Sequence, residues 1–340
     1  MDIHQKMKKC FRGHVTMNIS IITPAPLGSR VGNRATAERW SQLLEAAGHR
    51  VKIITEYQGE SCDLFVALHA WKSHEAVLRF RAEHPRIPLV VVLTGTDIYD
   101  HQYRFPEATH ESLRLADCLV GLHRRVSKDI PRRYGNKLAI VLQSADTPTG
   151  PPGPKQGFDV CVIGHLRYEK DPLRTALAAR QLPETSTIRV INAGKAHTSE
   201  WEEKALREQQ TNPRFQWLGE VDKPAIHQLM NRARVMVISS LMEGGANVVS
   251  EACRAGLPVI ASSISGNIGL LGKDYPGYFP VGDDTELARL LQHLEDSPEF
   301  LAELEARVAE LAGCFTPESE QAALLAAIDR AVAGRARLNP

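Results

Sequence analysis

The sequence predicts an α/β protein made of two Rossmann-like domains that face each other across a cleft. Its 340 residues exceed the roughly 100 to 200 residues of an ordinary domain, so two domains are expected. From residue 18 onward, short β-branched runs alternate with longer segments of helical periodicity, which is typical of βαβ units and parallel sheets. A stretch rich in proline and glycine separates two such series. Ligands of open α/β folds bind at the carboxyl ends of the strands, so functional residues are expected on the loops that follow strands.

The first domain is expected at residues 17–147. Its first strand is NISIITPAP, and the helix that follows spans Arg34 to Ala47 and is closed by Gly48. Further strands are expected at RVKIITEY, CDLFVALHA, PLVVVLTGTD, CLVGLH and LAIVLQSA. Residues 1–16 are basic and are expected to be either a disordered leader or an upstream mis-called start, and no function is assigned to them.

Residues 148–157 are predicted to link the domains, because the stretch DTPTGPPGPKQG can join neither a helix nor a central strand. The second domain is expected at residues 158–317, with strands at FDVCVIGH, TIRVINAG, RFQWLGE, RVMVISS and PVIASS. Helical segments lie between them, at 173–180, 200–210, 225–232 and 247–255. Helical periodicity at 285–295 and 318–333 is expected to close this domain, and residues 318–340 form a terminal helix and tail.

The composition is that of a globular protein without a global preference for charged partners. A formal net charge of +1 gives no overall attraction to nucleic acid or to an anionic membrane. No apolar run approaches the roughly 20 residues that span a bilayer, and the opening residues lack the apolar segment of a signal peptide. The six cysteines are scattered and are not paired with histidines at metal-ligand spacing. We therefore expect a cytoplasmic protein with no nucleic-acid partner, no stable membrane association and no metal, while its oligomeric state stays open.

The most informative segment of the second half is SSLMEGGANVVSEACRAGLPVIASS. A strand leads into a loop with Glu243, Gly244 and Gly245, and a helix follows whose first turn includes Ala246 and Asn247. Glycines let the backbone come close to a ligand, and the free N–H groups at a helix N-terminus favour a phosphate. The loop and helix start therefore predict a diphosphate site.

Glu243 and Glu251 are placed to hold the two ends of that ligand. Eight residues of helix span about 12 Å along the axis, which brackets a diphosphate. One carboxylate is expected to accept hydrogen bonds from a sugar and the other from ribose hydroxyls. Two isolated glutamates would be ordinary solvated side chains; the glycines, the preceding strand and the return strand that follows at GLPVI favour a site.

Two loops of the first domain suit a small anionic second substrate. The segment PAPLGSRVGNRATAERW surrounds a helix N-terminus with glycines, arginines and neutral donors; its candidate residues are Gly28, Arg30, Asn33 and Arg34. The segment LTGTDIYD ends a strand and is expected to turn Thr94, Gly95, Thr96 and Asp97 toward the cleft. Asp97 alternatively caps the next turn. His69, Trp71 and Lys72 follow another strand on the same side, with Trp71 more typical of packing.

The segment EGGANVVSEA followed by AGLPVIASSISGN resembles the Glu-x7-Glu signature of the retaining GT-B glycosyltransferases of family four. The resemblance extends from Met17 through GHLRYEKDP, WLGEV and YFPVGDDTELARLL. It implies a GT-B fold and a nucleotide-sugar donor held by the two motif glutamates, with Gly219 of WLGEV in the same donor set. The family's GRxxxxK loop neutralises the diphosphate, and here Lys170 occupies the Lys position while His165 replaces the Arg. Arg167 lies two residues later, and the sequence does not decide between His165 and Arg167.

Other departures from the family pattern concern both substrates. The second motif glycine and the following aliphatic residue are Ala246 and Asn247; the latter is expected either to contact sugar or acceptor or to cap the helix. Many family-four enzymes carry a histidine before the first-domain aspartate, whereas this chain has Thr96. An acceptor that is already an anionic nucleophile needs no general base.

Within the family, PAPLGSRVGNRATAERW, ALHAWKS, LTGTDIYD and GNIGLLGKDYPGYFPVGD are similar to the selenosugar synthases of selenoneine biosynthesis. That resemblance implies a UDP-sugar donor, UDP-N-acetylglucosamine or UDP-glucose, and selenophosphate as the acceptor. The products would be a 1-selenosugar, UDP and phosphate, with no cofactor. Under this hypothesis the catalytic set is Glu243, Lys170, Arg167 and Asp97. The alternatives are a family-four enzyme that acts on a hydroxyl, a UDP-sugar 2-epimerase, and a non-catalytic UDP-sugar sensor.

Overall fold

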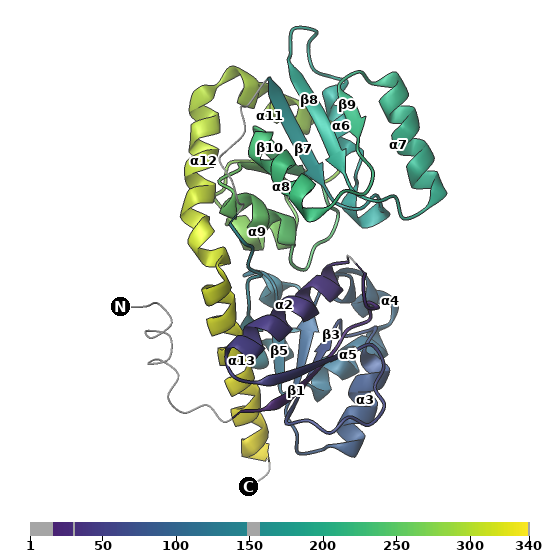
Figure 1. Cartoon of the computed structure of the whole chain (residues 1–340), viewed down its shortest axis with the longest axis vertical. Coiled ribbons are helices and arrows are strands. Elements are labelled where there is room, and N and C mark those ends of the chain that lie inside the picture. Colours follow the sequence, from purple (N-terminus) through teal and green to yellow (C-terminus); the bar gives the residue numbers. More distant parts are fainter. Residues whose placement is uncertain (1–15, 30, 148–156, 339–340) are drawn as a thin grey trace.

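A computed structural model describes residues 16–29, 31–147 and 157–338 of the chain. Most of the expected leader and linker, and the last two residues of the tail, lie outside these residues, as does Arg30. The described chain forms two six-stranded, fully parallel sheets, one in each half (Figure 1). The two Rossmann-like domains that the sequence predicted are therefore confirmed.

The first sheet has the strand order β2-β1-β3-β4-β5-β6. The bounds of these strands are β1 (Asn18–Ile22), β2 (Arg50–Ile54), β3 (Leu64–Leu68), β4 (Leu89–Leu93), β5 (Cys118–Gly121) and β6 (Leu138–Ile140). β3 and β4 are apolar along their whole length and buried at every residue, which is typical of parallel strands covered on both faces. The helices of this half are α2 (Gly32–Ala46), α3 (His74–Glu83), α4 (Gln102–Arg104) and α5 (Pro106–Leu115).

The second sheet has the strand order β12-β11-β10-β7-β8-β9. Its strands are β7 (Phe158–Ile163), β8 (Ile188–Ala193), β9 (Phe215–Trp217), β10 (Val235–Ile238), β11 (Val259–Ser262) and β12 (Tyr278–Phe279). The helices around it are α6 (Arg174–Ala179), α7 (Ser199–Thr211), α8 (Lys223–Arg232), α9 (Asn247–Arg254), α10 (Ser265–Leu271), α11 (Asp284–Asp296) and α12 (Pro298–Ala312). α10, α12 and β12 were not predicted from the sequence.

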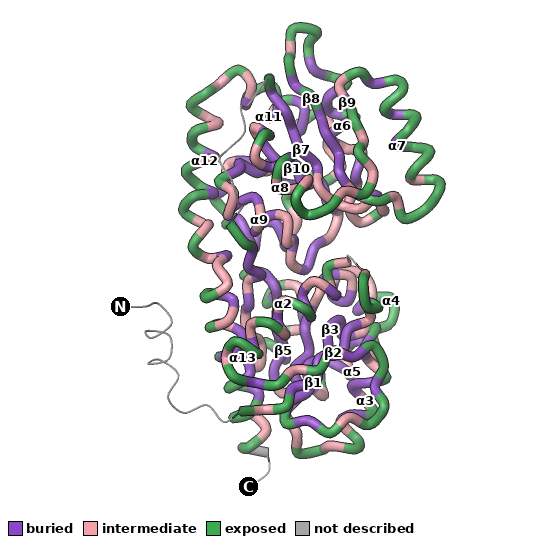
Figure 2. Tube along the Cα trace, viewed as in Figure 1, coloured by how far each residue is buried: buried purple, intermediate pink, exposed green. Residues whose placement is uncertain are grey.

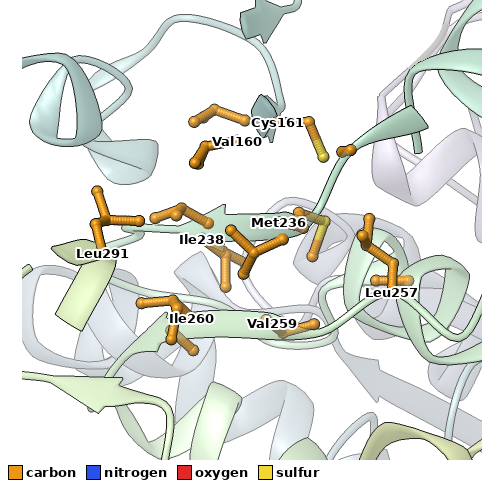
Figure 3. Packing of buried hydrophobic residues seen from close by; sticks show 14 of the residues in the cluster. Val160, Cys161, Met236, Ile238, Leu257, Val259, Ile260 and Leu291 are labelled. Carbon is orange, nitrogen blue, oxygen red and sulfur yellow. The ribbon is translucent and has the colours of Figure 1, made fainter. Parts of the chain in front are cut away.

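Each sheet has its own apolar core, and buried residues concentrate along the strands of both halves (Figure 2). In the second half, side chains of β7, β10 and β11 pack with Leu257 and with Leu291 of α11 (Figure 3). Burying these apolar side chains stabilises the strands by about 25 cal/mol for each Å² of apolar surface removed from water. The rigid sheets thereby fix the loops at their carboxyl ends.

The last helix, α13 (Pro317–Leu338), packs on the first domain (Figure 1). Its buried apolar residues are Leu324, Leu325, Ala327, Ile328 and Ala331, and they join one face of the first sheet. The expectation that this segment closes the second domain is wrong. Helical spacing of apolar residues shows that a face is buried, but not which sheet covers it.

No helix among the described residues combines the length and the apolar character needed to cross a bilayer.

Candidate active site

The glycine loop between β10 and α9 lies directly against the first domain. A Cβ atom added to Gly244 would lie 2.3 Å from the carbonyl carbon of Thr94, and one added to Gly245 would lie 2.6 Å from the Cβ of Leu122. Real Cβ atoms essentially never come closer than 3.0 Å to such neighbours. The sequence assigned these glycines to ligand approach. In this arrangement they also let the two domains meet.

The start of α9 offers free amides beside that contact. Ala246 occupies the N-cap position, and its side chain makes no capping hydrogen bond. None of the described residues accepts a hydrogen bond from the backbone N–H groups of Gly245, Ala246 or Asn247. These N–H groups and the positive end of the helix dipole are the elements that bind a phosphate.

Glu243 and Lys170 form an ion pair at the start of this loop. Lys170 belongs to the turn η4 (Tyr168–Lys170), which follows β7, and its Nζ donates to Oε1 of Glu243. The Ser240 hydroxyl donates to the same carboxylate oxygen at 2.6 Å, and Glu243 is buried. The sequence placed both side chains in one site without predicting that they form an ion pair.

A small pocket opens between the carboxyl ends of β7 and β10. Its lining residues come from these two strands and the loops after them: Val162, Ile163, Gly164, Lys170, Pro172, Val237, Ile238, Ser239 and Ser240. The hydroxyl of Ser239 donates to the carbonyl oxygens of Lys170 and Asp171, at 3.1 and 2.8 Å. The loop that carries Lys170 is thus tied to the strand that leads to Glu243.

The two candidates for the diphosphate cation differ in their surroundings. His165 accepts a hydrogen bond at Nδ1 from the backbone N–H of Lys195, at 3.3 Å, and its ring lies 5.2 Å from that of His197. Nε of Arg167 is buried without an acceptor among the described residues. Burial, together with the charge of Arg167, lowers the pKa of His197. Arg167 therefore brings a positive charge and an unused Nε–H donor to this loop.

Gly219 lies where the loops after β8 and β9 meet. It has a φ of 69°, which favours glycine, and a Cβ there would point into open space. Its carbonyl oxygen accepts a hydrogen bond from the N–H of Gly194 at 2.8 Å. The backbone at Gly219 is thereby fixed next to the loop of Lys195.

Glu251 and Asn247 face the first domain from α9. Burial raises the pKa of Glu251, the charges of Lys223 and Arg39 oppose this shift, and the charge of Asp146 adds to it. Asn247 is the first residue of the helix rather than its cap, so the capping alternative is wrong. Its Oδ1 instead accepts a hydrogen bond from Nη2 of Arg39, on α2, at 3.3 Å.

In the first domain, the loop before α2 differs in part from the expectation. Gly28 is exposed with a φ of 78°, and Asn33 is half-buried in the first turn of α2. Arg34 is buried, and its Nε donates to Glu38 at 2.6 Å. Arg34 is thus paired with Glu38 in the first turns of α2, and its contact with the acceptor stays a prediction.

Asp97 organises the loop after β4. Its carboxylate accepts hydrogen bonds from the backbone N–H groups of Ala70, Thr94, Gly95 and Ile98, at 2.8 to 3.1 Å. The side chain is fully buried. The expectation that it faces the cleft as a catalytic group is therefore wrong. The carboxylate instead ties the loops after β3 and β4 together, and the cap position of the next turn is held by Thr96. Gly95 does face the second domain, since an added Cβ would lie 2.7 Å from the nitrogen of Gly244.

Comparisons with known proteins agree with this geometry. Residues 150–311 match the family described as glycosyl transferases group 1. Sucrose-phosphate synthase from Thermosynechococcus elongatus superimposes with a TM-score of 0.75 at 16% identity, covering 93% of this chain and 99% of that one. HepE of Anabaena, solved in complex with UDP-glucose, superimposes with a TM-score of 0.73 at 16% identity, covering 92% and 99%.

The chain has the GT-B fold, and its second half is similar to the group 1 glycosyl transferases. Among curated proteins it is similar to the glycogen synthase of Mycobacterium tuberculosis, at 26% identity over 221 residues. That alignment covers 59% of this chain and 52% of the glycogen synthase, so the chain spans about half the length of this relative.

Two residues of the GT-B interdomain contact were not predicted. Gln143 follows β6, and in the amide orientation that satisfies all its neighbours it donates to the Gly245 carbonyl and to Oδ1 of Asn247, both at 3.0 Å. In that orientation the amide oxygen of Gln143 accepts a hydrogen bond from Nη2 of Arg39 at 3.0 Å. Single polar residues such as Gln143 and Arg39 carry no sequence pattern that marks a contact with a helix start more than 100 positions away.

Within residues 16–29, 31–147 and 157–338, no group of three His, Cys, Asp or Glu side chains could hold a metal ion. A metal-independent reaction stays a prediction.

Proposed function

We propose that this protein is a glycosyltransferase that moves a sugar from a UDP-sugar to selenophosphate. The observation that carries the proposal is the amide-lined start of α9, with Lys170 and Glu243 at its entrance and the first domain against Gly244. A nucleotide diphosphate would lie on the free amides, as anions do at helix N-termini. Structural relatives solved in complex with UDP and with UDP-glucose support the choice of donor.

In this proposal the second domain stabilises the leaving diphosphate. Lys170 and Arg167 would neutralise its developing charge together with the helix dipole, which is the kind of preorganised electrostatic stabilisation that lowers barriers most. We assign the diphosphate contact to Arg167 rather than to His165, because a guanidinium is always charged near pH 7 and Nε of Arg167 has no acceptor among the described residues. Glu243 would bind the sugar and Glu251 the ribose.

The acceptor half of the proposal rests on the resemblance to selenosugar synthases and on the loop after β4. Selenium would form a bond to the anomeric carbon while the bond from that carbon to the diphosphate oxygen breaks. UDP leaves, and water then splits the selenium–phosphorus bond to give the 1-selenosugar and phosphate. Thr96 stands where a general base would be expected for a hydroxyl acceptor, and an anionic nucleophile needs none.

Product analysis tests the proposal. The protein is incubated with UDP-N-acetylglucosamine or UDP-glucose, together with selenophosphate or with a panel of alcohols, and the products are identified by mass spectrometry. We expect a 1-selenosugar, UDP and phosphate in equal amounts. Alcohol glycosides alone would favour the hydroxyl-acceptor alternative, a changed donor without acceptor would favour an epimerase, and UDP-sugar binding without any product would favour a sensor.

A further inference from the structure

His69 has a strained backbone at the edge of the proposed acceptor site. It directly follows β3 with a φ of 75°, a conformation that residues other than glycine rarely adopt. Its side chain is buried, and its ring lies 5.2 Å from the ring of His101. Such strain persists only where the surroundings fix the residue, so the contacts of the ring are informative.

Both ring nitrogens of His69 are engaged, and this sets the tautomer. The backbone N–H of Lys72 donates to Nδ1 at 3.2 Å, so Nδ1 carries a lone pair. Nε2 lies 2.9 Å from Oγ1 of Thr96 and must then carry the proton. His69 is therefore the donor in this hydrogen bond and the Thr96 hydroxyl is the acceptor.

The ring stays neutral around pH 7. Burial is the main cause that lowers the pKa of His69, to about 4. The charge of Asp97 opposes this shift, while the charges of Lys72 and His101 add to it. A neutral ring with its proton on Nε2 has no lone pair directed at Thr96, so it cannot remove a proton from that side.

The proton of the Thr96 hydroxyl remains available to a ligand. No acceptor for it occurs among the described residues, and Thr96 is only half-buried. Its carbonyl oxygen accepts a hydrogen bond from Nδ1 of His101 at 2.7 Å, so the residue is held on a second side. Its neighbour Gly95 contacts Gly244, which places Thr96 beside the loop between β10 and α9, the proposed donor loop.

We propose that His69 is a positioning residue that fixes Thr96 as a hydrogen-bond donor to an anionic acceptor next to the donor loop. This inference rests on the proposed transferase function and deepens it. An arrangement that donates to the acceptor suits a nucleophile that is already ionised. A neutral hydroxyl acceptor would need a base here to take its proton; Nε2 of His69 already carries a proton, and the remaining lone pair of the Thr96 hydroxyl is not basic near pH 7.

Matched substitutions at the two positions separate positioning from other roles. Thr96→Val removes the hydroxyl at constant shape, and we expect the KM for selenophosphate to rise roughly tenfold or more, as for a lost hydrogen bond to a charged group. The KM for the UDP-sugar should change less than about twofold, since Thr96 lies in the other domain. Thr96→Ser should restore the selenophosphate KM.

At His69, Gln places an N–H near the position of Nε2 and Leu does not. We expect His69→Gln to recover most of the selenophosphate KM that His69→Leu loses, with circular dichroism to check that each variant folds. Equal losses of kcat in both variants would indicate a general base and would overturn the inference. If neither His69 variant folds, the comparison of Thr96→Val with Thr96→Ser still tests whether the Thr96 hydroxyl binds the acceptor.

Two further outcomes separate this inference from the proposed function. If wild-type protein makes the selenosugar and Thr96→Val keeps the wild-type selenophosphate KM, the positioning role is wrong and the transferase function stands. If wild-type protein turns over no anionic acceptor, calorimetry with selenophosphate in the presence of UDP still reports anion binding. Binding that Thr96→Val weakens supports the site, and absence of binding by the wild type rejects it.

Discussion

At the residue scale, the ion pair of Lys170 and Glu243 joins the two functions of the donor loop. In the proposed function Lys170 binds the diphosphate and Glu243 binds the sugar; in this structure the two side chains form an ion pair, and the Ser240 hydroxyl donates a hydrogen bond to the same carboxylate. Each partner holds the other in place in this structure. A bound donor would draw Lys170 toward the phosphates while Glu243 turns to the sugar.

Replacing Lys170 by Met should lower kcat by roughly 10² to 10³, as for removal of one group that stabilises developing negative charge. Lys170→Arg, which keeps the charge, should lose less. Steady-state kinetics with the UDP-sugar varied at saturating acceptor measures both. Circular dichroism checks that the partner left behind, the buried Glu243, does not unfold the domain. A Met variant with wild-type kcat would contradict the role of Lys170.

Glu251 gives a prediction that links stability to pH. Burial raises its pKa, so the folded protein binds this proton more tightly than the unfolded chain does. The ionised carboxylate therefore costs stability as pH rises above the ordinary range of a glutamate. Glu251→Gln should raise the Tm at pH 7. This gain should vanish near pH 4, where the wild-type glutamate is largely protonated and so is neutral like the glutamine of the variant.

The same substitution should weaken UDP binding by about tenfold, because a charged acceptor of ribose hydroxyls is lost. Calorimetry with UDP at pH 7 measures this. A variant that gains stability and keeps its full affinity for UDP would show that Glu251 does not contact the ribose.

At the scale of elements, the loop before α9 and the loop after β4 meet backbone to backbone. Gly244 and Gly95 contact each other directly, so the donor half and the acceptor half share one boundary. The sequence predicted glycines at this position for a ligand, and the strand, loop and helix around them were predicted from their pattern. Their second role, domain contact, depends on residues in another domain and has no local pattern.

Gly244→Ala should separate the two loops, because the added Cβ would lie 2.3 Å from the backbone of Thr94. We expect kcat to fall by on the order of 10², the cost of a misplacement of about 1 Å in a reacting pair. The Tm should change little, since neither core is touched. Gly313→Ala is the matched control, because nothing lies within 4 Å of an added Cβ there. Equal kcat in both variants would reject the close contact as a requirement for turnover.

At the scale of the whole molecule, the sequence predicted more of each domain than of their connection. The strands could be predicted because runs such as LVVVL, which are buried on both faces of a parallel sheet, are continuously apolar and β-branched. The segment from Glu243 to Glu251 could be predicted as a loop and helix start because its parts are contiguous in the sequence. Asp97 was ambiguous, since an aspartate after a strand serves either as a cap or as a catalytic group. The position of α13 was not predictable, because its apolar face would fit either sheet.

Glu320, near the start of α13, is the buried carboxylate that fastens this helix to the first domain. It accepts hydrogen bonds from Nε of Arg39 at 2.8 Å, Nε1 of Trp40 at 2.7 Å and the backbone N–H of Ser144 at 2.7 Å. Arg39 also donates a hydrogen bond to Asn247 at the start of α9, so the terminal helix supports the side chain that bridges the domains. One carboxylate therefore connects the end of the chain to the donor site.

Glu320→Ala leaves Arg39 and the indole N–H of Trp40 without their shared partner, and breaking a buried pair in this way costs about 3 to 5 kcal/mol. For a chain of this size we expect the Tm to fall by on the order of 10 °C. UDP affinity should also fall, because Arg39 loses the group that holds it toward Asn247. Glu318→Ala, an exposed position in the same turn, should change neither quantity. Thermal unfolding and UDP calorimetry measure the two effects. A large fall in Tm with unchanged UDP affinity would show that α13 supports the first domain alone and does not reach the donor site.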